Sequence, residues 1–210
     1  MKALSLQTLS LAGAALLALS PAAPVQAQSA GDWTVGVGIA NVAPVDNPGT
    51  LEGGLKTSIG KNARPTLTVE YFIKDNLGIE ILAATPFKHD IKIDGLGRVG
   101  TVKQLPPVIS LQAHFDTNTP FKPFLGVGVN WTSFFSEKSE GALAGSKLDV
   151  KHSFGLALHA GTDYQINERS ALRADIRWID INSDVHLNGK KIGKVEVDPL
   201  VVGASYVVKF

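Results

Sequence analysis

Acidic, basic and imidazole side chains recur in segments of the chain that otherwise alternate between apolar and small residues. This set comprises Glu70, Glu80, His114, Asp163, Arg173 and Asp175. Carboxylates and a guanidinium that meet in a confined space pair with one another, because an isolated buried charge is energetically expensive. If the segments surround a common lumen, we expect these side chains to form a charged floor that plugs it rather than an aqueous passage.

A second set of reactive side chains lies in the polar segments between the alternating ones: His89, Asp90, His152, Ser153, Asp184 and His186. A Ser, a His and an Asp catalyse acyl transfer only when hydrogen bonds join them, and polar loops contain such residues by chance. The five His show no close metal-ligand spacing, and the chain has no Cys. We therefore expect no enzyme, no metal site and no cofactor.

Composition narrows the class of protein further. The 210 residues are 44% hydrophobic and 19% charged, which fits one domain with a sizeable core. With 20 basic and 19 acidic residues the formal net charge is +1, and no block of like charges is long enough to follow a nucleic-acid backbone. We therefore expect no nucleic acid among the partners.

The first 27 residues have the three parts of a secretory signal peptide. Lys2 supplies the positive start, Leu4 to Leu19 the apolar stretch, and Val25-Gln26-Ala27 the small-x-small cleavage signal. A retained membrane anchor is disfavoured, because the apolar run is short and two prolines follow it. We expect cleavage after residue 27, so that 1–27 is a signal peptide and 28–210 the mature domain outside the cytoplasm.

The rest of the chain alternates with period two in eight segments, and the apolar parity of each carries no charge. These segments cover residues 33–39, 67–73, 77–83, 109–115, 125–131, 154–160, 172–178 and 200–210. Such alternation predicts two-faced β-strands. Long polar segments separate some strands, and short turns separate the others. The long ones span 43–62, 85–106, 136–152 and 182–198, and the short ones 74–76, 116–120 and 166–169.

This alternation of long and short connections is typical of an outer-membrane barrel, which has short turns in the periplasm and long loops outside. A soluble barrel of the lipocalin type is the alternative, but its outer face meets water and should carry charges. Here the strand charges, such as Glu80 and Arg173, share a parity with most strand glycines. The chain is therefore predicted to be an all-β, eight-stranded antiparallel transmembrane β-barrel with short periplasmic turns and four long extracellular loops.

Small and apolar residues on the inward parity predict the character of the lumen. Eight strands enclose a space just wide enough for side chains to fill, so an open pore requires small inward residues. We expect an apolar vestibule on the extracellular side of the charged floor. Its expected members are Leu82, Val108, Gly126, Gly128, Phe134, Ile179 and Val201.

The chain ends on an alternating apolar strand closed by an aromatic residue, with Tyr206, Val208 and Phe210 on one parity. This ending resembles the C-terminal signature that the outer-membrane assembly machinery recognises in barrel proteins. The expected location is therefore the outer membrane, and the expected partners are outer-membrane lipid and the assembly machinery.

Several long blocks of residues carry a more specific resemblance. They are Asn41-Val42-Ala43-Pro44, Arg64 to Phe72, Asp75 to Glu80, Leu82 to Ile91, Leu105-Pro106-Pro107, Gly141 to Gly145 and the closing strand from Asp198. In this order they cover essentially the whole mature chain, and they resemble the OmpW family. The resemblance implies an eight-stranded outer-membrane barrel with a narrow, largely apolar channel that helps small hydrophobic compounds cross the outer leaflet.

The vestibule and the resemblance together predict passage of small hydrophobic solutes across the outer membrane. The charged floor offers such solutes nothing, so we expect them to leave sideways between strands into the bilayer. A barrel without transport is the alternative, acting as a receptor surface for phage or toxins or as a reinforcement of the membrane. The long loops would serve that role as well as they serve a vestibule.

Overall fold

The computed structural model describes residues 28–44, 49–51, 54–59 and 62–210. The segment 1–27, which the sequence predicts to be a signal peptide, lies outside the described residues. Among those residues, no helix is long and apolar enough to cross a membrane.

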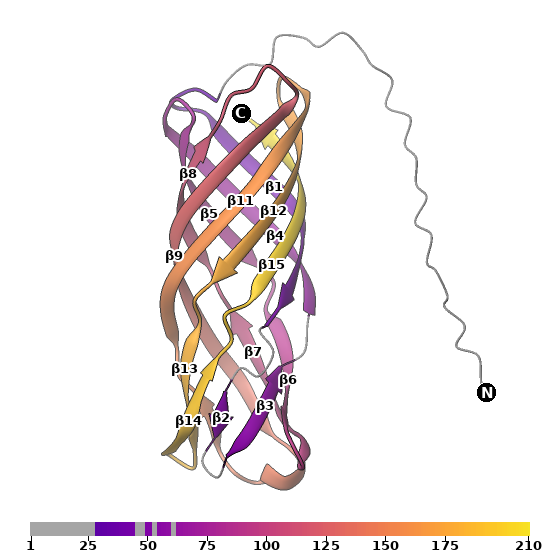
Figure 1. Ribbon diagram of the computed structural model, residues 1–210, viewed down its shortest axis with the longest axis vertical. Helices are drawn as coiled ribbons and strands as arrows, with labels where there is room; N and C mark the ends of the chain where they lie inside the picture. The colour runs from indigo at the N-terminus through magenta and orange to yellow at the C-terminus, as the bar shows by residue number, and fades with distance from the viewer. Residues whose placement is uncertain (1–27, 45–48, 52–53, 60–61) are drawn as a thin grey trace, which may run out of the picture.

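Eight long strands form a closed antiparallel barrel (Figure 1). Around the barrel the order is β9-β11-β12-β15-β1-β4-β5-β8, and pairing of β8 with β9 closes it. The predicted fold is therefore confirmed. The strands are β1 (Trp33–Ala43), β4 (Asn62–Lys74), β5 (Leu77–Ala84), β8 (Val108–His114), β9 (Phe121–Ser139), β11 (Ser153–Asn167), β12 (Ser170–Ile179) and β15 (Leu200–Lys209).

The long polar segments are themselves largely strands, which the sequence did not predict. They form a lobe that continues the barrel away from its short turns and C-terminus, toward the bottom of Figure 1. The tip of one hairpin is Asn188-Gly189, and both residues have the positive φ that a tight hairpin turn requires. The lobe consists of β2 (Thr50–Leu51), β3 (Leu55–Ile59), β6 (Phe87–Ile93), β7 (Gly97–Leu105), the outer part of β9, the short 3-10 helix η1 (Gly141–Leu143), β10 (Leu148–Val150), β13 (Asn182–Leu187) and β14 (Lys190–Glu196).

Barrel and lobe have opposite polarity. In the barrel the apolar parity points outward, so that Val37, Val127 and Leu158 are at least half exposed, whereas Glu70 and Glu80 inside are 1% exposed. In the lobe the apolar side chains point inward and lysines such as Lys88 point outward. The inversion indicates that the medium outside changes from lipid to water where the barrel meets the lobe.

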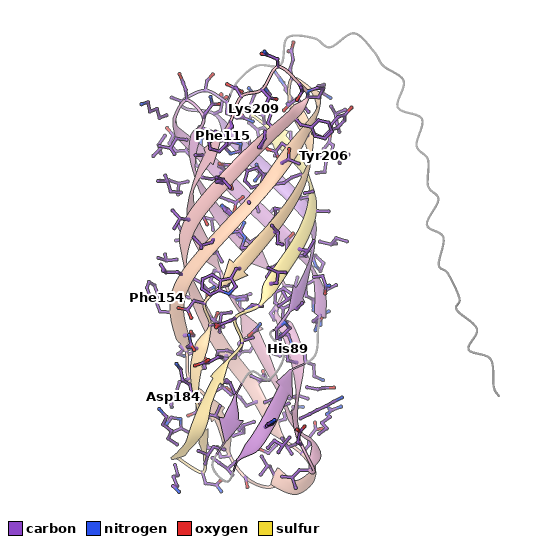
Figure 2. All side chains as sticks on the ribbon, in the orientation of Figure 1. His89, Phe115, Phe154, Asp184, Tyr206 and Lys209 are labelled. Atoms are coloured by element: carbon purple, nitrogen blue, oxygen red, sulfur yellow. The ribbon has the colours of Figure 1, made fainter. Side chains whose placement is uncertain are left out.

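Exposed aromatic side chains form two bands around the barrel, as expected at the two interfaces of a membrane. Figure 2 shows Phe115 and Tyr206 near the short-turn end and Phe154 about halfway along the molecule. The lobe, with His89 and Asp184, lies beyond Phe154. The band near the short turns comprises Trp33, Tyr71, Phe115, Phe121, Tyr206 and Phe210, and the second band Trp131, Phe154 and Trp178.

The outward face provides a first test of this arrangement. Val127 and Leu158 are direct partners on β9 and β11, midway between the aromatic bands. Val127→Arg or Leu158→Arg should destabilise the inserted barrel by about 2–4 kcal/mol, because an Arg at the midplane faces hydrocarbon. The measurement is the yield of folded, heat-modifiable protein in the membrane. Phe154→Arg, at the outer band, is the matched control and should cost at most about 1 kcal/mol; equal losses for all three variants would contradict the assignment.

Candidate functional site

Arg173 on β12 is the centre of an ionic cluster inside the barrel. Its Nε and Nη2 donate to the two carboxylate oxygens of Asp163 at 2.7 and 2.9 Å, and its Nη1 donates to Glu80 Oε2 at 2.9 Å. A third carboxylate, that of Glu70, lies 3.5 Å from Nη2. These four side chains are at most 5% exposed. Paired, fork-shaped contacts of this kind offset the desolvation of buried charge.

Further polar side chains complete the cluster on neighbouring strands. Gln112 Nε2 donates to Glu70, and His114 Nε2 lies 2.9 Å from Glu70 Oε1. Arg177 Nη2 donates to Glu80 Oε1 at 2.7 Å, while His159 Nδ1 is 3.8 Å from the same oxygen. The expected floor therefore contains Glu70, Glu80, His114, Asp163 and Arg173 in direct contact, together with Gln112, His159 and Arg177, which were not among its expected members. All three lie on the inward parity, which was the available signal.

Asp175 stands apart from this network. It is half-buried and borders a small hollow on the lobe side of the cluster, together with Arg177 and Ser205. Its carboxylate fills the space beside Gly203, where a Cβ would come 2.6 Å from Oδ1. Asp175 thus belongs to the expected floor by position, but it extends toward the hollow instead of bridging the two arginines.

Two aromatic rings close the lumen on the short-turn side of the cluster. Phe72 and Phe124 are 0% and 1% exposed. The Arg173 guanidinium lies 4.5 Å from the centroid of Phe124, within the range of a cation–π contact. His114 packs against both rings, at centroid distances of 5.1 and 5.5 Å. The ions and the rings together obstruct passage along the barrel axis.

The inward glycines do not open a pore, contrary to the reasoning that placed Gly126 and Gly128 in the vestibule. A Cβ on Gly126 would collide with the imidazole of His159, so this glycine makes room for a member of the cluster. A Cβ on Gly128 would collide with the backbone carbonyl of Ile109 on the neighbouring strand. At both positions the space that a side chain would need is already occupied, by the His159 imidazole and by the Ile109 carbonyl.

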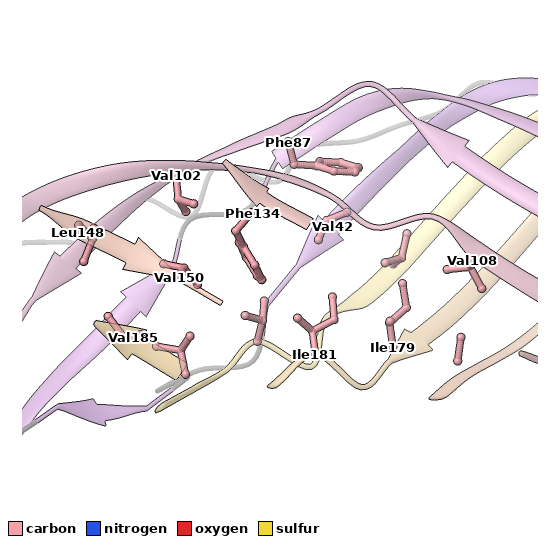
Figure 3. Close-up of a cluster of buried hydrophobic side chains, with 14 of the residues drawn as sticks. Val42, Phe87, Val102, Val108, Phe134, Leu148, Val150, Ile179, Ile181 and Val185 are labelled. Carbon is pink, nitrogen blue, oxygen red and sulfur yellow. The ribbon is translucent and has the colours of Figure 1, made fainter. Parts of the chain in front are cut away.

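The other expected vestibule residues lie at three levels. Leu82 and Val201 border the small hollow next to the cluster. Val108 and Ile179 are 0% and 2% exposed and belong to a packed apolar column, which Figure 3 shows running from the barrel into the lobe. Phe134, farther along that column, borders a second cavity that lies in the lobe. The expected vestibule is thus mostly filled.

The second cavity lies inside the lobe, where the space between the atoms, including the part open to solvent, amounts to about 650 Å³. Two polar side chains, His89 and Gln104, line it and are themselves almost completely buried. The remainder of the lining is apolar: Ile91, Ile93, Val99, Val102, Phe134, Leu143, Leu148, Val150, Val185, Ile192, Val195 and Val197. Such a concave, apolar surface with few polar groups suits a small hydrophobic molecule.

The side chains considered for catalysis make other contacts. Ser153 Oγ accepts a hydrogen bond from the Asn182 backbone, and Asp184 pairs with Lys191 at 2.7 Å. This hydrogen bond from Lys191 holds the pKa of Asp184 below its usual range. The His152 ring lies near that of Trp131, tilted against it, at a centroid distance of 6.2 Å. No hydrogen bond among the described residues joins a Ser, a His and an Asp of this set.

The sequence of this chain matches that of a known protein family. The model of the OmpW family matches residues 29–210, the whole described barrel and lobe. The chain belongs to the OmpW family. OmpW-family relatives are named outer membrane proteins, so the barrel is an outer-membrane barrel. Barrels of this class have short turns in the periplasm and long segments outside, which puts the lobe of this chain outside the cell.

Three similar proteins show that the likeness covers most of the OmpW-family chain. Outer membrane protein W of Vibrio cholerae is 36% identical over 211 residues, which are 94% of this chain and 97% of that protein. The crystal structure of OprG from Pseudomonas aeruginosa superimposes with a TM-score of 0.79 at 33% identity, covering 89% of this chain and 99% of that one. A Pseudomonas aeruginosa protein named for a dibenzothiophene metabolism operon, PahQ, is 26% identical over 187 residues, 82% of this chain and 86% of its own.

The C-terminal residues of this OmpW-family chain lie at the periplasmic rim. Tyr206 and Phe210 are exposed on the outer face, at 46% and 75%, and Val208 between them is half-buried. The Phe210 backbone N–H donates to the Trp33 carbonyl at 2.9 Å, so the last residue still pairs with the first barrel strand. The terminal strand β15 thus stays paired with β1 up to its end.

Proposed function

We propose that the protein passes small hydrophobic molecules from outside the cell into the outer membrane. The observation that carries this proposal is the apolar cavity of the lobe, which is separated from the periplasm by the packed column and the ionic cluster. A relative named for dibenzothiophene metabolism, the metabolism of an apolar compound, supports the same class of solute. Neither catalysis nor a cofactor is part of the proposal.

A break in the strand ladder supports an exit sideways into lipid. Pairing of β5 with β8 ends at Leu82 and Val108, and pairing of β6 with β7 begins at Phe87 and Gln104. Between these pairs the backbone carries Pro86 on one side and Pro106-Pro107 on the other, and a proline cannot donate a ladder hydrogen bond. Phe87 and Gln104 flank the gap on the inside, and Gln104 also lines the cavity. We propose this gap as the exit.

Leaving through the gap is energetically easier than leaving through the floor. A solute that crossed the ionic cluster would have to separate buried ion pairs, each at several kcal/mol. Moving past the side chains of Phe87 and Gln104 separates no ion pair and breaks no ladder hydrogen bond between β5 and β8. The lateral route therefore requires only local side-chain motion.

The test is uptake of matched apolar and polar solutes by cells that make or lack the protein. We expect faster uptake of the apolar solutes alone. If uptake of neither class depends on the protein, the transport proposal fails, and a receptor or reinforcing role of the barrel replaces it. If both classes enter faster together with ionic conductance, solutes pass through the floor and the lateral exit is wrong.

We also propose that the C-terminal strand is the signal for the assembly machinery. Deletion of Phe210 should reduce the amount of folded barrel in the outer membrane severalfold without reducing export to the periplasm. The measurement is the ratio of heat-modifiable outer-membrane protein to soluble periplasmic protein. Phe210→Tyr keeps the aromatic ring and is the control, which should assemble normally. An unchanged yield after deletion would remove the assignment.

A further inference from the structure

Two lysines stand directly opposite each other on the outer face of the lobe. Lys88 on β6 pairs in register with Lys103 on β7, and both side chains are exposed. Their chain neighbours Phe87, His89 and Gln104 are buried inside, so the two ammonium groups point outward together. Like charges directly opposite on antiparallel strands repel, so this pair destabilises the hairpin unless something neutralises it.

The next basic pair along the same hairpin is neutralised within the protein. Lys92 stands opposite Arg98, and Arg98 lies 2.9 Å from a carboxylate oxygen of Glu140 and 3.7 Å from one of Asp90. Within the part of the chain that the structure describes, no carboxylate comes within ion-pair distance of Lys88 or Lys103. Acidic side chains of the chain thus neutralise the pair far from the barrel, Lys92 and Arg98. The inner pair, Lys88 and Lys103 near the barrel, is left for a partner.

The position of the inner pair indicates what that partner is. Lys103 stands opposite Phe135 on β9, four residues beyond Trp131 of the outer aromatic band. Four strand residues advance about 13 Å along a tilted strand, and less along the membrane normal. Figure 2 shows His89, the neighbour of Lys88, just past Phe154 on the lobe side. The two ammonium groups therefore lie at the level of the lipid headgroups, above outward apolar residues such as Ile109 and Trp131.

We propose that Lys88 and Lys103 bind a phosphate group of lipid A, the phosphorylated glycolipid base of lipopolysaccharide in the outer leaflet. Two ammonium groups on adjacent strands complement one phosphate, and basic residues at a membrane surface attract anionic headgroups. The acyl chains of the same lipid would cover the apolar face below. The bound phosphate supplies the negative charge that the hairpin lacks. The proposal does not depend on transport.

The test is retention of lipid A by the full-length barrel in phosphatidylcholine nanodiscs doped with diphosphorylated lipid A, followed by native mass spectrometry. The double variant Lys88→Gln/Lys103→Gln should weaken binding by roughly ten- to thirtyfold, since each surface basic residue near an anionic headgroup contributes about a fivefold effect. Lys92→Gln/Lys138→Gln removes the same charge from the same part of the lobe, farther from the membrane, and should bind like the wild type. Heat-modifiability confirms that all variants are folded.

Three outcomes would overturn the assignment. Equal retention by the two double variants would show that only overall charge matters. Equal retention of dephosphorylated lipid A by the wild type would show that the acyl chains alone are recognised. Displacement of lipid A by an equal concentration of inorganic phosphate would indicate a site for free phosphate instead of a lipid headgroup.

Discussion

Replacing Arg173 with Met should lower the free energy of unfolding by about 3–5 kcal/mol, because it leaves buried carboxylates without their central partner. Arg173 contacts Asp163, Glu80 and Glu70 at once, whereas Arg177 donates to Glu80 alone. After the substitution, the carboxylates of Asp163 and Glu70 would have no guanidinium within hydrogen-bond distance. The measurement is urea unfolding of the barrel in lipid vesicles.

Two further variants show whether the loss of stability comes from the buried ion pairs of Arg173. Lys191→Met breaks the exposed ion pair with Asp184 in the lobe and should cost no more than about 1 kcal/mol. Arg173→Met combined with Asp163→Asn removes both members of the closest pair and should recover part of the loss, since one buried charge then no longer lacks its partner. A loss below about 1 kcal/mol for Arg173→Met would mean that water, and not the guanidinium, stabilises the carboxylates.

Filling the lobe cavity should reduce uptake of apolar solutes about tenfold. Val150 and Val185 stand opposite each other on β10 and β13, and both line the cavity. Phe at both positions would occupy space that the solute uses. A solute that loses roughly 60 Å² of apolar contact loses about 1.5 kcal/mol, or about a factor of ten in occupancy. The measurement is the initial rate of uptake of a labelled apolar solute by cells.

The matched control for the cavity places the same bulk outside it. Asp149 and Asp184 are the chain neighbours of the two valines on the same strands, and they point to the outer surface of the lobe. Asp149→Phe/Asp184→Phe should leave apolar uptake near the wild-type rate. Equal reduction by both double variants would show a general effect on the lobe, and no reduction by the valine variant would show that solutes bypass the cavity.

The strands and the charged floor were predictable because both depend on period two. A barrel strand has only two faces, so placing Val127 outward places Glu80 and Arg173 inward, and inward charges in so narrow a lumen must meet. Parity alone does not show which inward side chains lie at the same height along the barrel axis, because their heights depend on strand register. Arg177 lies on the inward parity but was not predicted as a member of the floor, and neither were Phe72 and Phe124 as its aromatic cover.

The location of the cavity could not be predicted by the same reasoning. Parity identifies the inward face of a strand only where one medium surrounds its whole length, whereas here the outside changes from lipid to water between barrel and lobe. Beyond that level the apolar side chains face inward and the charged ones outward, as in β6, where Phe87 and Ile93 face inward and Lys92 faces water. With lysines interspersed, such segments resemble polar loops. The vestibule was consequently predicted at residues such as Val108 and Ile179, which belong to the packed apolar column.

Strand β9 differs from its neighbours in one respect that bears on how the lobe is attached to the barrel. It runs for 19 residues without a break, whereas residues 85–86, 106–107, 151–152, 180–181 and 197–199 interrupt the five other connections between barrel and lobe that the structure describes in full. Amide hydrogen exchange should therefore be slow along β9 on both sides of this level and faster in the segments that border the interruptions. Within the described residues, β9 is the strand that continues from the barrel into the lobe, so its paired backbone ties the two parts together, and bending between them is confined to the interrupted segments.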